Sequence, residues 1–328
     1  MKAAIHRKYG TPDIVSIEDV PCPEPAGDEI QVQVVATSIN DYDWGLISGR
    51  PLFIRLFLGL FRPRIQIAGC DIAGRVVKVG DQVTRWHAGD EVYGDLSGGR
   101  FGGFAETVCC KAHQVASKPA ELSFEDAAGI PQAAVLAWQG LNSAGPLRDG
   151  LEILINGAGG GVGSYGLQLA KQHQVNVAGV DSGSKLAMMQ ELGFDQVIDY
   201  RQENFARLGQ RWDLIVDTKT CYLPGAYCRA LKPGGTYATV GGSLWKMLLI
   251  LLTRPFYRLL TGKNLTVIAL RQNLNLDEFS KLAVAGKLRT VTDGPYPFAE
   301  LPQVLNYYLT AAHQGKIIIR IGQNADAS

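Results

Sequence analysis

The residues best suited to chemistry form a glycine-rich stretch directly after a short apolar run. Residues 151–156 read Leu-Glu-Ile-Leu-Ile-Asn, which predicts a β-strand, and residues 164–173 place apolar side chains at helical spacing. A tight turn between a strand and a helix brings backbone N–H groups and the positive helix N-terminus close to an anion. We therefore predict a dinucleotide site on Gly157, Ala158, Gly159, Gly160, Gly161, Val162 and Gly163.

A second apolar run continues this pattern. Residues 175–180 are predicted to form a strand that ends at Asp181, about 20 residues after the turn, where a group that binds the ribose is expected. The alternative is a flexible glycine-rich loop without a ligand. It is disfavoured because one strand precedes the loop, and a helix and a second strand follow it.

Composition limits the classes of function. The chain has 328 residues, a formal net charge of +1 and 46% hydrophobic residues, which suit a sizeable core and about two domains. Near-neutral charge without a basic run argues against nucleic acid as a partner. The six cysteines show no C-x-x-C spacing, so free thiols in a reducing compartment are the simplest account. Because residues 1–7 lack the apolar region of a signal peptide, we expect a cytoplasmic protein.

Two kinds of pattern follow one another along the chain. Residues 1–125 are β-rich, with Pro and Gly between strand-like segments, whereas strands and helices alternate later in the chain. Such alternation predicts a parallel sheet covered by helices on both faces. The strands predicted for this sheet are Glu152–Asn156, Val175–Val180, Gln196–Asp199, Asp213–Asp217, Thr236–Val240 and Leu265–Ala269, and helices near 276–285 and 299–312 precede a last strand over 316–321.

Further short motifs occur from the first part of the chain to the last. They include Ser38–Trp44 (Ser-Ile-Asn-Asp-Tyr-Asp-Trp), Gly69–Gly74, Gly89–Gly94 and Gly102–Glu106, besides the turn Ala158-x-Gly160-x-x-Gly163. In this order and spacing they resemble the zinc-independent, quinone-oxidoreductase-like branch of the medium-chain dehydrogenase/reductase superfamily, and they are similar to those of chloroplast-envelope quinone oxidoreductase-like proteins.

The resemblance implies an α/β fold with two domains. A GroES-like β-rich catalytic domain would comprise residues 1–125 and 273–328. A Rossmann NAD(P)-binding domain, which is a doubly wound parallel sheet, would comprise residues 126–272. The resemblance also implies a homodimer.

The resemblance further bears on metal. Zinc-dependent members carry a Cys near the first motif and a His-Glu pair in the second, where this chain has Asn40 and Cys70-Asp71. The adjacent Cys109 and Cys110 cannot readily supply two ligands, because neighbouring side chains of a strand face opposite ways. We therefore expect no metal and a reaction that depends on the nicotinamide alone. Such a reaction favours an acceptor that is already electrophilic, such as a quinone or an α,β-unsaturated carbonyl.

The residues expected around the 2′ end of the cofactor give conflicting indications of whether it is NADPH or NADH. By resemblance, Ser182, Lys185 and Tyr200 occupy places that NADP-dependent members use, and Lys and hydroxyl groups suit a phosphate. Asp181 opposes this assignment, because NAD-dependent members use an acidic group there for the ribose hydroxyls. We favour NADPH and leave NADH open. The alternative for Lys185 is that it is a solvated helix residue without a role in binding. Gly241 and Gly242 complete the expected cofactor-binding residues.

The candidate catalytic residues are Asn40, Tyr42 and Asp43. Asn40 could donate its amide to a carbonyl oxygen or hold the nicotinamide ribose, and Asp43 could orient Asn40 or a water molecule. Tyr42 or water would supply the proton. The alternative is that Asn40 and Asp43 cap a helix, and that Tyr42 belongs to the core.

Two positions depart from the family pattern. Leu136 stands where members commonly have a Thr that contacts the cofactor, and Lys219 departs from their D-x-V-G sequence. The loss of the Thr hydroxyl keeps a second class of function open: an NAD(P)-binding protein with weak catalysis that serves as a redox sensor or membrane-associated adaptor.

Two apolar segments have no role in the nucleotide pattern. One covers residues 52–61 and the other residues 244–262, where Lys246, Arg254 and Arg258 interrupt or flank the apolar residues. Neither approaches the roughly 20 apolar residues that a membrane-spanning helix needs. We favour a wall for an apolar quinone or enone. Peripheral membrane contact through residues 244–262 and a contact between subunits are the alternatives.

Overall fold

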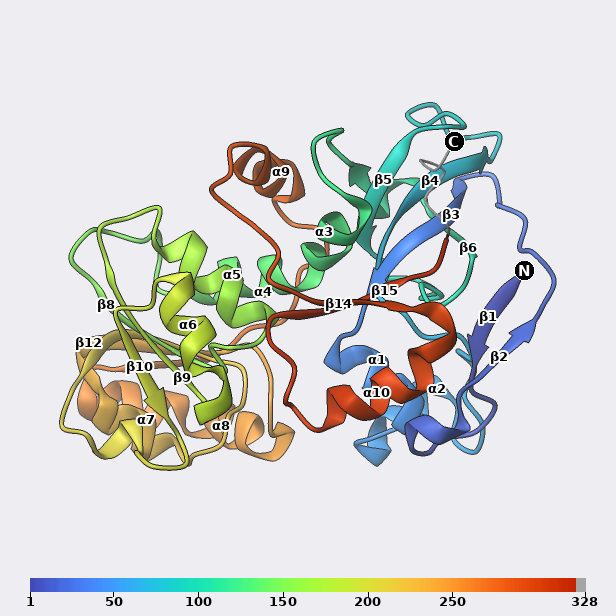
Figure 1. Cartoon of the computed structure of the whole chain (residues 1–328). Coiled ribbons are helices and arrows are strands. Elements are labelled where there is room, and N and C mark those ends of the chain that lie inside the picture. Colours follow the sequence, from blue (N-terminus) through green and yellow to red (C-terminus); the bar gives the residue numbers. More distant parts are fainter. Residues whose placement is uncertain (323–328) are drawn as a thin grey trace. The chain divides into compact units, whose positions relative to one another are not determined.

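The predicted parallel sheet forms the centre of one unit of the chain in the computed structural model, which describes residues 1–322 (Figure 1). Its strand order is β10-β9-β8-β11-β12-β13, and every neighbouring pair is parallel. The order reverses between β8 and β11, as in a doubly wound fold, so the fold prediction for this unit is confirmed. The strands are β8 (Glu152–Asn156), β9 (Asn176–Asp181), β10 (Gln196–Asp199), β11 (Trp212–Asp217), β12 (Leu231–Thr239) and β13 (Asn264–Val267).

Helices cover both faces of this sheet because its strands carry apolar side chains on both sides. Figure 1 shows α5 on one face, and α7 and α8 on the other. The second face packs around aromatic residues, with the rings of Tyr227 and Tyr237 stacked at 3.9 Å and Trp212 fully buried. The helices are α4 (Pro131–Leu141), α5 (Gly161–Ala170), α6 (Leu186–Leu192), α7 (Pro224–Ala230) and α8 (Leu244–Thr261), with short 3₁₀ turns η4 (Gly183–Lys185) and η5 (Phe205–Arg207).

The other unit is built on a seven-stranded sheet of order β14-β15-β3-β4-β5-β7, with β6 paired to β3. Its strands come from both ends of the chain, since β15 runs antiparallel to β3 and pairs Ile318 with Ser38. The strands are β3 (Glu29–Ser38), β4 (Asp71–Val79), β5 (Glu91–Asp95), β6 (Thr107–Lys111), β7 (Ala116–Ser117), β14 (Thr292–Pro297) and β15 (Lys316–Arg320), and a separate pair is formed by β1 (Lys2–Ile5) and β2 (Ser16–Asp19).

Short helices join these strands. The first two, α1 and α2, follow β3 and carry the motif at Asn40 and the first apolar segment. The helices are α1 (Asp41–Ser48), α2 (Arg55–Leu58), α3 (Phe124–Gly129), α9 (Leu276–Val284) and α10 (Leu301–Leu309), with 3₁₀ turns η1 (Pro12–Ile14), η2 (Leu52–Ile54), η3 (Ala112–Gln114) and η6 (Phe298–Glu300).

The division between the units lies close to, but not at, the expected residues. The β-rich unit contains residues 1–132 and the described residues from 272 onward, and the nucleotide unit contains Ala133–Arg271. The expected boundary after residue 125 falls inside α3. This helix belongs to the β-rich unit because it packs against β3 and β4.

The longest helix, α8, has 18 residues and contains Lys246, Arg254 and Arg258. In the part of the chain that the structure describes, neither α8 nor any other helix combines the length and apolarity needed to cross a membrane.

The close packing of Gly163 against Ala158 predicts how substitutions in the turn before α5 affect stability. A Cβ at Gly163 would stand 2.4 Å from the Cα and carbonyl oxygen of Ala158, whereas a Cβ at Gly160 would meet only the Gly157 oxygen at 3.6 Å. Gly163→Ala should therefore lower the free energy of unfolding by about 1–3 kcal/mol, because the backbone of Ala158 must shift. Gly160→Ala is the matched control and should unfold like the wild type in denaturant titrations. Equal stability of both variants would contradict this packing.

Candidate nucleotide and acceptor sites

The glycine turn connects β8 to α5 at the carboxyl edge of the parallel sheet. Gly157 has a φ of +85°, and a Cβ there would lie 2.0 Å from the Thr218 Oγ1. Only glycine fits this position without strain. The loop after β11 is thereby held directly against the loop after β8, at the point where the strand order reverses.

Most N–H groups of the turn are already bonded within the protein. Gly157 and Ala158 donate to the Val180 carbonyl at 2.9 and 3.1 Å. Gly159 donates to the Asp181 carboxylate at 2.9 Å, and Gly160 to the Gly157 carbonyl at 3.3 Å. The donors that remain are those of Gly161, Val162 and Gly163, because the first N–H groups of a helix have no partner within it.

These free donors fit the pyrophosphate of a dinucleotide. They lie at the N-terminus of α5, where the helix dipole is positive and can bind an anion. The nearest protein atom to a Cβ at Gly160 is 3.6 Å away, so this side of the turn is open. The residues predicted for the dinucleotide site are therefore brought together in a cradle suited to that ligand.

Asp181 is turned into the protein. Its Oδ2 accepts from the Gly159 N–H, and its Oδ1 accepts from the Ser182 N–H at 2.8 Å and lies 3.6 Å from Lys185 Nζ. Both side chains of the ion pair are at least nine-tenths buried. The alternative that Lys185 is solvated is thus wrong, and its methylene groups cover Gly159, because a Cβ there would lie 2.6 Å from Lys185 Cδ.

The carboxyl ends of β9 and β10 place hydroxyl groups and an arginine near Asp181. Tyr200 donates its N–H to the Asp181 carbonyl at 3.1 Å, and its half-exposed ring lies 5.8 Å from the Arg201 guanidinium. The hydroxyls of Ser182 and Ser184 are 3.2 Å apart. Arg201 is not among the residues predicted from the sequence, although its position directly after Tyr200 could have indicated it.

Gly241 and Gly242 follow β12 at the same edge. The Gly241 carbonyl accepts from the hydroxyls of Thr220 and Thr239. Gly242 has a φ of +106°, and a Cβ there would lie 2.0 Å from the Lys219 carbonyl oxygen. The two glycines therefore hold the loop after β11 in place from one side, as Gly157 does from the other.

In the β-rich unit, Asn40 is bonded on both sides of its amide. Its Nδ2 donates to Asp71 Oδ2 at 3.0 Å, and its Oδ1 accepts from Lys316 Nζ at 2.6 Å. Lys316 also lies 3.5 Å from Asp71, which accepts from the Ser38 hydroxyl at 2.9 Å. This buried network joins β15 to the loop before α1.

Asp43 caps α1. Its two oxygens accept from the N–H groups of Asn40 at 2.8 Å and Gly69 at 3.0 Å, and its side chain is fully buried. Burial raises the pKa of Asp43 to about 7. The bond to the Asn40 backbone matches the expectation that Asp43 orients Asn40, and it equally fulfils the capping alternative.

Tyr42 is the one candidate catalytic residue with an exposed side chain. It is 49% exposed, and burial of the remainder raises the pKa of its hydroxyl. The hydroxyl therefore stays protonated at neutral pH and can serve as a proton donor. The alternative that Tyr42 belongs to the core is wrong.

Both apolar segments expose their side chains. On η2, α2 and the following turn, Phe57 is 76% and Phe61 86% exposed. On α8 only Ile250 is buried. The exposed large apolar residues of α8 recur every three to four residues and so share one side of the helix; they are Leu244, Trp245, Leu248, Leu251, Leu252, Phe256, Leu259 and Leu260.

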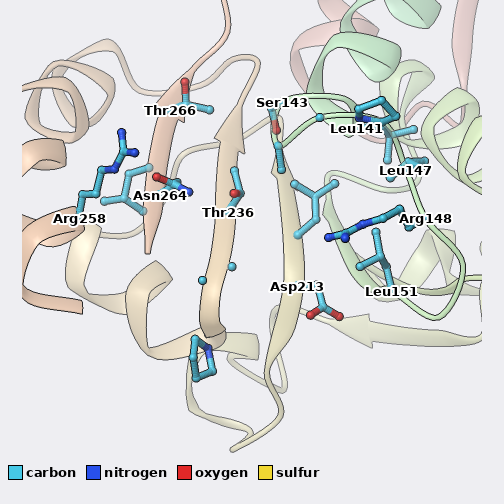
Figure 2. Close-up of a pocket in the computed structure, with 18 of the residues that line it drawn as sticks. Leu141, Ser143, Leu147, Arg148, Leu151, Asp213, Thr236, Arg258, Asn264 and Thr266 are labelled. Carbon is cyan, nitrogen blue, oxygen red and sulfur yellow. The ribbon is translucent and has the colours of Figure 1, made fainter. Parts of the chain in front are cut away.

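A cavity of about 520 Å³ lies at the opposite edge of the nucleotide unit's sheet. Figure 2 shows its lining, which includes Asp213, Thr236 and Asn264 near the amino ends of β11, β12 and β13, with Arg148 and Arg258 beside them. Ligands of doubly wound sheets bind at the carboxyl ends of the strands, so this cavity is not the dinucleotide site. Within residues 1–322, no group of three or more His, Cys, Asp or Glu side chains could hold a metal ion.

Comparison with known proteins agrees with this two-part architecture. Residues 26–120 match the alcohol dehydrogenase GroES-like domain, and residues 192–319 match the zinc-binding dehydrogenase domain. The 2-methylene-furan-3-one reductase of Solanum lycopersicum is 33% identical, with 97% of this chain and 79% of that protein covered. The chloroplast envelope quinone oxidoreductase homolog of Arabidopsis thaliana is 30% identical, with 92% of each chain covered.

Solved structures show the same fold. The quinone oxidoreductase from Coxiella burnetii has a TM-score of 0.86 at 25% identity, covering 98% of this chain and 99% of its own. These features define a dehydrogenase/reductase with a GroES-like part and a doubly wound nucleotide part. The chain belongs to the medium-chain dehydrogenase/reductase superfamily.

The buried carboxyl of Asp43 predicts how stability depends on pH. Its pKa rises from an ordinary 3.8 to about 7 in the folded chain, so between these values the unfolded chain releases a proton that the folded chain keeps. The free energy of unfolding should therefore fall as the pH rises toward 7, by up to about 1.4 kcal/mol per pH unit from this group. Denaturant titrations at several pH values measure this slope.

The matched variants are Asp43→Asn, which cannot titrate, and Asp19→Asn, which removes a carboxyl from a side chain that is 79% exposed. Asp43→Asn should flatten the slope and should also lower stability at every pH, since its amide nitrogen cannot accept an N–H. Asp19→Asn should leave the slope unchanged. A slope that is the same in the wild type and Asp43→Asn would contradict the raised pKa.

Proposed function

We propose that this chain is an NAD(P)H-dependent reductase of quinones or α,β-unsaturated carbonyl compounds with an apolar body. The observation that supports this most is the open first turn of α5 beside Gly160, in a chain of an oxidoreductase superfamily. Relatives carry the names 2-methylene-furan-3-one reductase and NADPH-dependent alkenal/one oxidoreductase.

The reaction needs a hydride donor and a proton donor. A reduced nicotinamide, when bound, supplies a hydride to an electrophilic carbon of the acceptor. The Tyr42 hydroxyl, protonated and half-exposed, supplies the proton, with water as the alternative donor. Asn40 and Asp43 keep α1, and with it Tyr42, in position, because their side chains are engaged within the β-rich unit.

The donor set around Asn40 supports a reaction without zinc. The amide oxygen of Asn40 already accepts from Lys316, and the ammonium of Lys316 lies 3.5 Å from Asp71. A zinc site needs several deprotonated N, S or O ligands directed at one point, and a bound ammonium among them would oppose the cation.

NADPH is the cofactor that these residues favour. The charge of Asp181 is balanced by Lys185 and by two backbone N–H groups, so its carboxylate does not repel a 2′-phosphate strongly. Ser182, Ser184 and Arg201 offer hydroxyls and a guanidinium at the same edge, and such groups suit a phosphate.

The exposed apolar segments would serve the apolar body of the acceptor. About 25 cal/mol per Å² is the free energy that covering such surface contributes, so an uncovered face of this kind marks a contact site. Peripheral contact of α8 with a membrane is the second role that its exposed Leu and Phe residues and its basic residues suit. The family resemblance supports a homodimer.

The proposal predicts turnover that does not depend on metal. NADPH oxidation should accelerate with quinones and conjugated enones, including long-tailed quinones, and should persist after extended dialysis against a strong chelator. Elemental analysis should then show substoichiometric zinc. Loss of activity on chelation with recovery on adding zinc would contradict the zinc-independent reaction, and tight NADPH binding without turnover on any acceptor would favour the redox sensor.

The cofactor assignment predicts selective effects at the 2′ end. Arg201→Gln should weaken NADPH binding about tenfold, which corresponds to about 1.4 kcal/mol, and should leave NADH nearly unchanged. Lys185→Ala should act in the same direction, because Asp181 would lose its cation. Arg207→Gln, an exposed charge in η5, is the control. A wild type that prefers NADH, with neither variant changing either affinity, would identify Asp181 as a ribose ligand and contradict the assignment.

A further inference from the structure

We propose that Lys219 is a binding residue for the pyrophosphate of the nucleotide. The inference rests on the proposed use of NAD(P)H and concerns a residue that departs from the family's sequence pattern. It is carried by the place of Lys219 over the glycine turn and by the bonding of the turn itself.

The loop after β11 places Lys219 beside Gly157. A Cβ at Gly157 would lie 3.2 Å from Lys219 Cε, so the lysine's methylene chain extends over the turn. The Lys219 N–H donates to Asp217 at 2.8 Å, and the Lys219 carbonyl lies against Gly242. The backbone of Lys219 is thus fixed on both sides, while its ammonium remains at the surface.

The ammonium of Lys219 is not committed elsewhere. Its residue is exposed, and no carboxylate of residues 1–322 forms an ion pair with it. The other lysine at the turn, Lys185, is buried against Asp181. Lys219 is therefore the cation at this turn that can meet an incoming anion.

The hydrogen bonds within the turn leave few donors for a pyrophosphate, so an additional cation such as Lys219 would strengthen binding. The N–H groups of residues 157–160 are all bonded within the protein, and that of Gly159 is bonded to a carboxylate. The turn thus offers a dianionic pyrophosphate only the first N–H groups of α5, beside the ion pair of Asp181 and Lys185. An ammonium on the opposite side of the turn supplies the positive charge that these few donors lack.

Ligand fragments distinguish this role from a contact with the 2′-phosphate. ADP-ribose, NADH and NADPH contain the pyrophosphate, whereas 2′-AMP contains the 2′-phosphate and no phosphate on the 5′ side. Lys219→Gln should weaken the first three about tenfold by calorimetry and leave 2′-AMP nearly unchanged. Lys219→Arg should restore most of the affinity. In Lys219→Gln, which lacks the positive charge, the affinity for ADP-ribose should depend less on salt concentration than in the wild type.

The control is Arg211→Gln, which removes one exposed charge just before the amino end of β11, the strand whose other end leads to Lys219. It should bind all four ligands like the wild type. Unchanged ADP-ribose affinity in Lys219→Gln, or an equal loss for 2′-AMP, would overturn the role of Lys219 alone. A folded wild type that binds neither ADP-ribose nor NADPH would overturn the proposed function as well.

Discussion

The close approach of backbone to backbone at the start of α5 is the constraint on which the nucleotide unit depends. Gly163 lets α5 touch Ala158, and Gly157 lets the loop after β8 touch Thr218. Side chains at these positions would push apart elements that must meet at the carboxyl edge of the sheet. Because they meet, the first N–H groups of α5, the Asp181–Lys185 ion pair and Lys219 all lie beside the glycine turn.

Each unit contains a buried carboxylate paired with a buried lysine. In the nucleotide unit the buried carboxylate of Asp181 is neutralised by a neighbouring lysine and by backbone donors, so the turn stays receptive to an anion. In the β-rich unit, Lys316 near the chain's end is bonded to Asn40 and Asp71 from its first half. Removing one partner of such a buried network generally costs several kcal/mol, because the other charge is left unpaired. These bonds therefore hold β15 in the sheet and fix the loop that leads to Tyr42.

The sequence predicted the architecture well because the architecture follows from patterns along the chain. Three patterns can be recognised without knowledge of tertiary contacts: the alternation of strands and helices, the turn at Gly157–Gly163 and the spacing of the short motifs. The boundary near residue 125 was misplaced because the packing of α3 on β3 and β4 leaves no signal in its own residues.

The directions of polar side chains could not be predicted in the same way. A carboxylate at Asp181 and an ammonium at Lys185 look like ligands in a sequence, and only the fold turns them toward one another. The same holds for Asn40, whose amide is occupied by two residues far away in the chain. The positions of Lys219 and Arg201 could not be predicted either, because they depend on which strand ends the sheet brings together.

A crystal structure of the chain with NADPH and a quinone is the most direct test of the proposed dinucleotide site. This site would hold the pyrophosphate at the first N–H groups of α5, with the adenosine ribose beside Ser182 at the end of β9. A nucleotide bound at another place, such as the cavity lined by Arg148 and Arg258 at the opposite edge of the sheet, would contradict it.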